Sequence, residues 1–118
     1  MERSRGQTGA RGEDAAADVY GRRGYRVVAR NWRCRLGELD LVVERAGVLV
    51  FCEVKARRQS AFGGGFEAVT GRKRAKLRAL AQAFLQATGS HPGAIRFDVA
   101  SVAVHAGQPT VEVFEEAF

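Results

Sequence analysis

The 118-residue chain lacks the residues that mark several common protein classes. It has only two cysteines, Cys34 and Cys52, without CxxC spacing, and its histidines, His91 and His105, form no metal-binding pattern with them. A zinc site is therefore not expected, and the cysteines are predicted to be reduced thiols. No apolar run approaches the roughly 18 residues of a membrane span, and the polar start, MERSRGQTGARGEDAA, has no apolar core of a secretory signal. These absences favour a cytoplasmic protein with no membrane partner.

Acidic residues are scarce through most of the chain. Residues 1–96 hold all 19 Lys and Arg and nine of the 13 acids, a net charge of +10, whereas residues 97–118 hold four acids and no base. This positive charge favours a polyanionic partner, and a solvated basic face is the alternative. The length suits one ordinary core. We expect a single domain over residues 1–118, with the polar residues 1–7 mobile.

Hydrophobic periodicity predicts two helices and five strands. The apolar stripes that begin at Ala16 and at Leu77 predict helices over residues 8–23 and from residue 67 or 70 to residue 88. Alternating or continuous apolar runs predict the strands, which are expected at residues 25–33, 37–45, 48–56, 94–104 and 110–114. The order α-β-β-β-α-β-β indicates an α/β fold with a mixed central sheet covered by helices.

Two carboxylates stand in strands that otherwise look built for burial. Asp40 lies within LDLVV, and Glu53 directly follows VLVFC. If residues 46–47 form a two-residue hairpin loop, the register sets Asp40 opposite Glu53 and Glu38 opposite Lys55, with facing Cβ atoms about 5 Å apart. The residues expected on the other face of the hairpin are Leu39, Leu41 and Val54.

A facing pair of carboxylates needs a compensating charge. Two negative charges ~5 Å apart repel by about 3 kcal/mol at an effective dielectric of ~20. A proton or a basic side chain could relieve this, but Mg²⁺ or Mn²⁺ fits best, because such ions bind carboxylates and complete their coordination with water and phosphate. With Asp40 and Glu53 as ligands and Lys55 orienting water or stabilising charge, the set has the parts for phosphodiester hydrolysis. The alternative is a half-exposed strand with a wet face.

Glu13 occupies an unusual place on the first predicted helix. Positions 13, 16, 17 and 20 form one stripe, which reads Glu, Ala, Ala, Tyr. A glutamate on the core side of an amphipathic helix adds to the case for a site. Stabilisation of the helix N-terminus is an equally good explanation.

Basic residues gather around a glycine-rich segment, RRQSAFGGGFEAVTGRKRAKLR, at residues 57–78. It contains neither GxGxxG nor GxxxxGK[ST], so it is no nucleotide-binding fingerprint. The residues predicted to contact a phosphate backbone are Arg57, Arg58, Arg72, Lys73 and Lys76. The alternative is a solvated helix end on a mobile loop. By contrast, Trp32 is expected to pack in the core, and Arg96 and Asp98 are expected to form a local ion pair in a core strand.

Taken together, these segments resemble a known family. In order and spacing, GEDAAADVY, GYRVVARNWR, GELDLVV, VFCEVKARR, AVTGRKRAKL and RFDV are similar to the YraN-like family of small bacterial proteins with predicted nuclease function. That family lies in the restriction-endonuclease-like superfamily, alongside archaeal Holliday junction resolvases. The resemblance covers about residues 9–104. It departs at Leu39, where the superfamily often has proline.

The resemblance implies an α-β-β-β-α-β core with a divalent-metal site. Asp40 and Glu53 would be its metal ligands, Glu13 an additional ligand, Lys55 the catalytic lysine and Lys73 a phosphate contact. The expected function is a Mg²⁺- or Mn²⁺-dependent DNA endonuclease, acting on branched or single-stranded structures in repair or recombination, with a homodimer as a possible assembly. The alternative is a non-catalytic nucleic-acid-binding accessory protein.

Overall fold

The described part of the chain forms two helices and five strands. The computed structural model describes residues 4–56 and 71–118, without the side chains of residues 4–11 and 105. The elements in chain order are α1 (Ser4–Arg22), β1 (Arg26–Cys34), β2 (Gly37–Arg45), β3 (Val48–Ala56), α2 (Gly71–Thr88), β4 (Ala94–His105) and β5 (Gln108–Phe114). The predicted order and the α/β class are confirmed.

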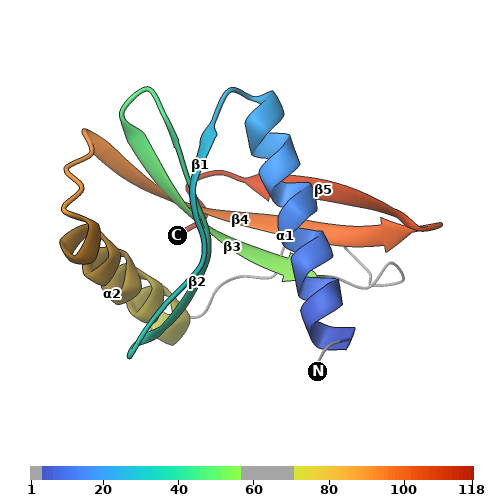
Figure 1. Cartoon of the computed structure of the whole chain (residues 1–118), viewed down its shortest axis with the longest axis horizontal. Helices are drawn as coiled ribbons and strands as arrows, with labels where there is room; N and C mark the ends of the chain where they lie inside the picture. The colour runs from blue at the N-terminus through green and yellow to red at the C-terminus, as the bar shows by residue number, and fades with distance from the viewer. Residues whose placement is uncertain (1–3, 57–70) are drawn as a thin grey trace.

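The strands form one mixed sheet in the order β1-β2-β3-β4-β5 (Figure 1). Only β3 and β4 are parallel, and the other neighbours are antiparallel. A parallel pair needs a long crossover connection, and α2 lies in the segment that makes it. This α-β-β-β-α-β arrangement is compatible with a restriction-endonuclease-like fold.

Apolar clusters cover both faces of the sheet. Leu49 and Phe51 of β3 pack with α2, while Val50 and Cys52 pack with α1. The helix residues buried against the sheet are Ala16 and Tyr20 from α1, and Leu77, Leu80, Ala81 and Phe84 from α2. The strand predicted to be buried on both sides is therefore confirmed. Trp32 also packs as expected, with its ring edge-on to Phe84 at 5.3 Å.

The β2–β3 hairpin turns through two residues with left-handed backbone. Ala46 has φ 52° and Gly47 has φ 80°, the signs that a type I′ turn requires. Glycine adopts this conformation without the steric cost that a Cβ imposes. Arg45 lies opposite Val48, so the predicted even-numbered loop is confirmed.

Several boundaries differ from those expected. α1 begins at Ser4 instead of residue 8, and β5 begins at Gln108 instead of residue 110. The predicted start of the second helix before Gly71, and the glycine-rich loop, lie outside the described residues. Within the described ranges, neither helix is both long and apolar enough to cross a membrane.

Candidate active site

The site lies where β2 and β3 stop pairing. Their register runs from Arg45 opposite Val48 to Leu41 opposite Cys52. At the next step, Asp40 uses its side chain: Oδ2 accepts a hydrogen bond from the backbone N–H of Val54 at 2.9 Å. The side chain of Asp40 thus bonds to β3 where main-chain pairing has ended. This hydrogen bond holds Asp40 next to the part of β3 that contains Glu53.

One expectation about this hairpin is wrong. Leu39 was expected on the same face as Leu41, but Leu39 packs in the α2-side cluster and Leu41 in the α1-side cluster. Side-chain alternation is therefore broken at Asp40, between them. The neighbouring strand is irregular at the same level, because Asn31, between the residues that pair with Leu41 and Leu39, has φ 54°. The break places Asp40 where groups from both helices influence it.

The surroundings of Asp40 disfavour the ionised form of its carboxyl group. Burial is the largest cause that raises its pKa, from the usual 3.8 to about 7, and the hydrogen bond from Val54 opposes this. Negative charge on nearby carboxylates raises the pKa further, and these carboxylates are, in decreasing effect, Glu53, Glu13 and Glu38. The charges of three further carboxylates, two from the sheet and one from α1, therefore act on Asp40.

Glu53 has a basic partner from α2. Lys73 Nζ lies 2.8 Å from Glu53 Oε2, and the side chains are 50% and 13% exposed, respectively. The hydrogen bond to Glu53 is the main reason why the pKa of Lys73 is raised, and the charge of Asp40 adds to it. Lys73 was predicted to contact phosphate. In this structure its ammonium group offsets part of the negative charge of the site.

Glu13 reaches the same region from α1. Its Oε1 accepts a hydrogen bond from Asn31 Nδ2 at 2.9 Å and lies 4.0 Å from Arg30. Burial raises the pKa of Glu13, and Asn31 and Arg30 counteract this. The side chain is 12% exposed, so the predicted core-facing glutamate is confirmed. Its charge acts on Asp40, whereas its hydrogen bond to Asn31 and its ion pair with Arg30 are with β1.

The residues fit a divalent cation as a two-carboxylate site. Within residues 4–56 and 71–118, no group of three or more His, Cys, Asp or Glu side chains is arranged to hold a metal ion. Mg²⁺ commonly takes only one or two protein carboxylates and fills the remaining positions with water and phosphate. Asp40 and Glu53 supply the hard oxygen atoms such an ion prefers, and a cation there would offset the charge that raises the pKa of Asp40.

The remaining predicted site residues lie on β3, on α2 or outside the described residues. Lys55 is half-buried, two residues beyond Glu53 on β3, and lies opposite Ser101 of β4. Arg72 and Lys76 are exposed on the first turns of α2. Arg57 and Arg58 lie outside the described residues.

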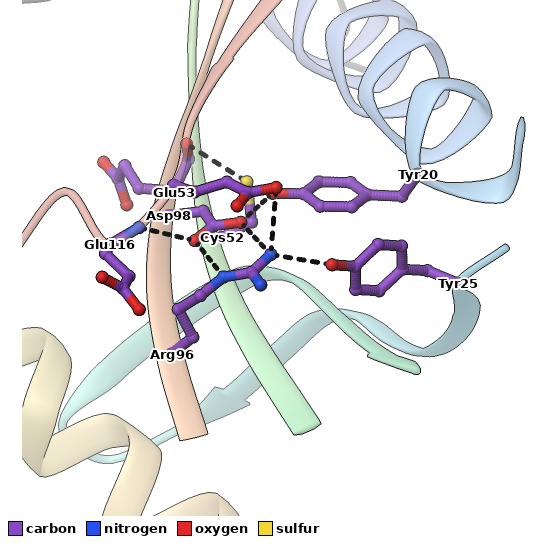
Figure 2. A network of polar contacts seen from close by, with 8 residues as sticks. Tyr20, Tyr25, Cys52, Glu53, Arg96, Asp98 and Glu116 are labelled. Atoms are coloured by element: carbon purple, nitrogen blue, oxygen red, sulfur yellow. Dashed lines mark hydrogen bonds and ion pairs between the residues drawn. The ribbon is translucent and has the colours of Figure 1, made fainter. Parts of the chain in front are cut away.

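A second polar cluster lies close by, beneath α1 (Figure 2). Asp98 is fully buried and accepts hydrogen bonds from Tyr20 at 2.6 Å and from Arg96 at 2.9 and 3.0 Å. The backbone N–H of Glu116 adds another at 3.1 Å, and Arg96 also donates to the hydroxyl of Tyr25 at 3.0 Å. The expected Arg96–Asp98 ion pair is confirmed. With its charge met by several donors, Asp98 serves to fasten α1, β4 and the C-terminal segment together.

The structure adds Asn31, which the sequence analysis missed, to this site. Asn31 holds Glu13 from within β1 and adopts left-handed backbone there. A signal was available, because asparagine is disfavoured inside strands but tolerates positive φ. The sequence does not predict that Asn31 contacts Glu13, because 18 residues separate the two and no local pattern links them.

Comparisons with known proteins agree on one family. The sequence profile described as "Uncharacterised protein family UPF0102" matches residues 12–102. A UPF0102 protein of Clavibacter michiganensis is 47% identical over 110 residues, covering 92% of this chain and 93% of its own. One from Symbiobacterium thermophilum is 48% identical over 96 residues and covers 81% of both chains. One from Pelotomaculum thermopropionicum is 43% identical over 120 aligned positions and covers 100% of both.

Proposed function

The chain belongs to the UPF0102, or YraN-like, family, and we propose that it is a Mg²⁺- or Mn²⁺-dependent DNA endonuclease that hydrolyses phosphodiester bonds. The observation that carries this proposal is the convergence of acidic charge on Asp40 at the end of the β2–β3 pairing. A fold gains nothing from setting Glu53, Glu13 and Glu38 near a partly buried carboxyl group. Such charge concentrations are typical of sites that bind cations or perform catalysis.

The proposed roles follow from the chemistry of each side chain. Asp40 and Glu53 would hold the cation, which supplies Lewis acidity and lowers the pKa of a water molecule. Lys55 would orient that water or stabilise the negative charge that grows on the phosphoryl oxygens. Water oxygen bonds to phosphorus, the bond from phosphorus to one sugar oxygen breaks, and a proton ends on the released hydroxyl. Glu13, held by Asn31, would keep the cation position negative.

DNA would approach over the N-terminal part of α2. Arg72 and Lys76 are exposed there, and Lys73 lies at the edge of the site. Basic side chains of this kind bind phosphates without regard to sequence and supply affinity that falls with salt. Branched or single-stranded DNA, in repair or recombination, remains the substrate class that the family resemblance implies. Cytoplasmic location and a homodimer likewise remain predictions.

The decisive experiment is a cleavage assay with Mg²⁺, Mn²⁺ or EDTA on linear duplex, single-stranded and branched DNA. We expect cleavage by the natural protein and a loss of about a hundredfold or more in Glu53→Ala and Asp40→Ala. DNA binding measured in EDTA should not weaken, because the basic surface supplies most of the affinity. Asp18→Ala, which removes an exposed acid of α1, is the matched control. Nicking that persists undiminished in both site variants would rule out this site as its source.

A non-catalytic nucleic-acid-binding protein is the second candidate. The exposed basic residues of α2 favour it as much as they favour the nuclease. It predicts salt-dependent DNA binding that neither metal nor the Glu53→Ala change affects. Asp40 and Glu53 separate the two functions, since a simple binding module has no need of clustered carboxylates.

A further inference from the structure

The cation position beside Glu53 already has a positively charged neighbour. Lys73 Nζ lies 2.8 Å from Glu53 Oε2, which is hydrogen-bonding distance for an ammonium and a carboxylate. The two residues come from different elements, α2 and β3, so nothing in the local chain requires them to meet. Glu53 is only 13% exposed, and an unpaired carboxylate at that depth would be costly.

Lys73 is more exposed to solvent than its partner Glu53. Its side chain is 50% exposed and sits on the solvent side of α2, at the end of a flexible four-carbon stem. A cation that binds Glu53 through oxygen repels an ammonium group at this distance. The lysine would then turn outward, into solvent.

We propose that Lys73 is a positioning residue that couples metal binding to nucleic-acid binding. Without metal its ammonium pairs with Glu53 and competes for the cation position. Once a divalent cation binds, Lys73 is displaced and becomes available to a DNA phosphate. This inference rests on the proposed function, because it concerns the same cation site.

The coupling must act in both directions. If metal frees a phosphate-binding lysine, nucleic acid that engages the lysine must raise the affinity for metal by the same factor. The site would therefore hold its cation most tightly when DNA is present. Substituting Lys73 should affect DNA binding strongly with metal and weakly without it, because in the metal-free protein the lysine is engaged with Glu53.

The first test is a calorimetric titration of the folded protein with Mn²⁺ alone. Lys73→Met should bind the ion about tenfold more tightly than the natural protein, because it removes the competing charge. Lys73→Arg retains a countercharge and should stay near the natural affinity. Arg78→Met is the matched control. It removes a positive charge from the same helix, but its guanidinium lies over the ring of Phe97, 4.9 Å from the ring centroid.

The second test is fluorescence anisotropy with labelled DNA in EDTA or Ca²⁺, a hard cation used here as a probe. We expect Lys73→Met to match the natural protein in EDTA and to lose fivefold or more of the Ca²⁺-dependent gain. An equal loss in both conditions would make Lys73 an ordinary phosphate contact and overturn the coupling. Unchanged Mn²⁺ affinity in Lys73→Met, with clear binding by the natural protein, would overturn the inference and leave the nuclease proposal intact. No Mn²⁺ binding by either protein would overturn both.

Discussion

Two polar clusters, one around Asp98 and one around Asp40, lie near each other in this small fold, and their carboxylates have different partners. Asp98 is fully buried, yet Arg96, Tyr20 and a backbone N–H all donate to it. Asp40 is less buried, receives a hydrogen bond from Val54, and faces the charges of other carboxylates. Donors surround the carboxylate of Asp98, whereas three further carboxylates act on Asp40 and Lys73 offsets only part of their charge.

The different partners of Asp98 and Asp40 indicate that the first stabilises the fold and the second serves the proposed function. A buried acid whose hydrogen bonds are satisfied gives a network that fixes the packing of α1 and β4. An acid whose pKa is raised toward 7 by burial and like charge leaves the site in need of a cation or a proton. We therefore expect changes at Asp98 to affect folding and changes at Asp40 to affect pH dependence, metal binding and cleavage.

The largest effect should come from Asp98→Ala. The change removes the buried carboxylate that accepts hydrogen bonds from Arg96 and from the hydroxyl of Tyr20, and it leaves Arg96 with the half-exposed carboxylate of Glu115 at 3.7 Å. Breaking a buried pair from one side costs about 3–5 kcal/mol. Urea unfolding monitored by circular dichroism measures this. A cost below about 1 kcal/mol would mean that the network does not stabilise the fold.

Tyr20→Phe tests the same network more gently. It keeps the ring that packs against Tyr25 but removes the donor to Asp98. Hydrogen bonds to charged groups contribute about 1.5–3 kcal/mol, so we expect a loss near 2 kcal/mol in urea unfolding. Tyr25→Phe is the paired comparison, because the hydroxyl of Tyr25 accepts a hydrogen bond from Arg96. Equal losses of unfolding free energy in Tyr20→Phe and Tyr25→Phe would mean that the hydrogen bond from Tyr20 to Asp98 has no special role and that Arg96 provides the stabilisation.

In contrast to the two changes above, Asp40→Asn should stabilise the metal-free protein at neutral and alkaline pH. Because the pKa of Asp40 is raised from 3.8 to about 7, the folded protein keeps a proton that the unfolded chain has released between these values. Metal-free stability should therefore fall as pH rises from 4 through 7. The full shift corresponds to about 4 kcal/mol, and screening by water should reduce this to about 1–2 kcal/mol.

The measurement is urea unfolding of the metal-free protein at several pH values. The Asn variant should equal the natural protein near pH 4 and exceed it at pH 8. Asp18→Asn, at an exposed position of α1, is the control and should show no such divergence. An Asp40→Asn variant that is less stable at pH 8 would mean that the carboxylate is not opposed by its neighbours.

The smallest effect should be stabilisation by metal. Mg²⁺ or Mn²⁺ at ten times its dissociation constant should stabilise the natural protein by about 1.4 kcal/mol through binding linkage. A thermal melt with and without the ion measures this. Asp40→Asn should remove the response, whereas Tyr20→Phe should retain it. A response retained in the Asn variant would locate the ion elsewhere.

Much of the fold was readable from local pattern. The two strands of the hairpin, Gly37–Arg45 and Val48–Ala56, begin and end where alternation and the turn predict. The pairing register follows from the two-residue loop, because loop length fixes which residues face each other. The same register predicts that Asp40 and Glu53 lie near each other at one end of the hairpin.

Local pattern failed where the backbone departs from regular geometry. The face assigned to Leu39 was wrong, because strict alternation assumes an uninterrupted strand. At Asp40 a hydrogen bond between its side chain and the backbone of Val54 replaces main-chain pairing, and the sequence LDLVV contains no pattern that predicts this. The starts of α1 and β5 were misplaced for a related reason, since helix and strand ends carry the weakest periodic signal.

The sequence by itself determined the α/β order, the apolar faces of β3 and α2, the excess of basic charge, and the two carboxylates at one end of the hairpin. Only the tertiary structure decided their partners: Lys73 with Glu53, Asn31 with Glu13, and Tyr20 with Asp98. The physical reason is range. Periodicity and turn length act over a few residues, whereas these contacts join residues 18 to 78 positions apart and exist only once both helices have packed on the sheet.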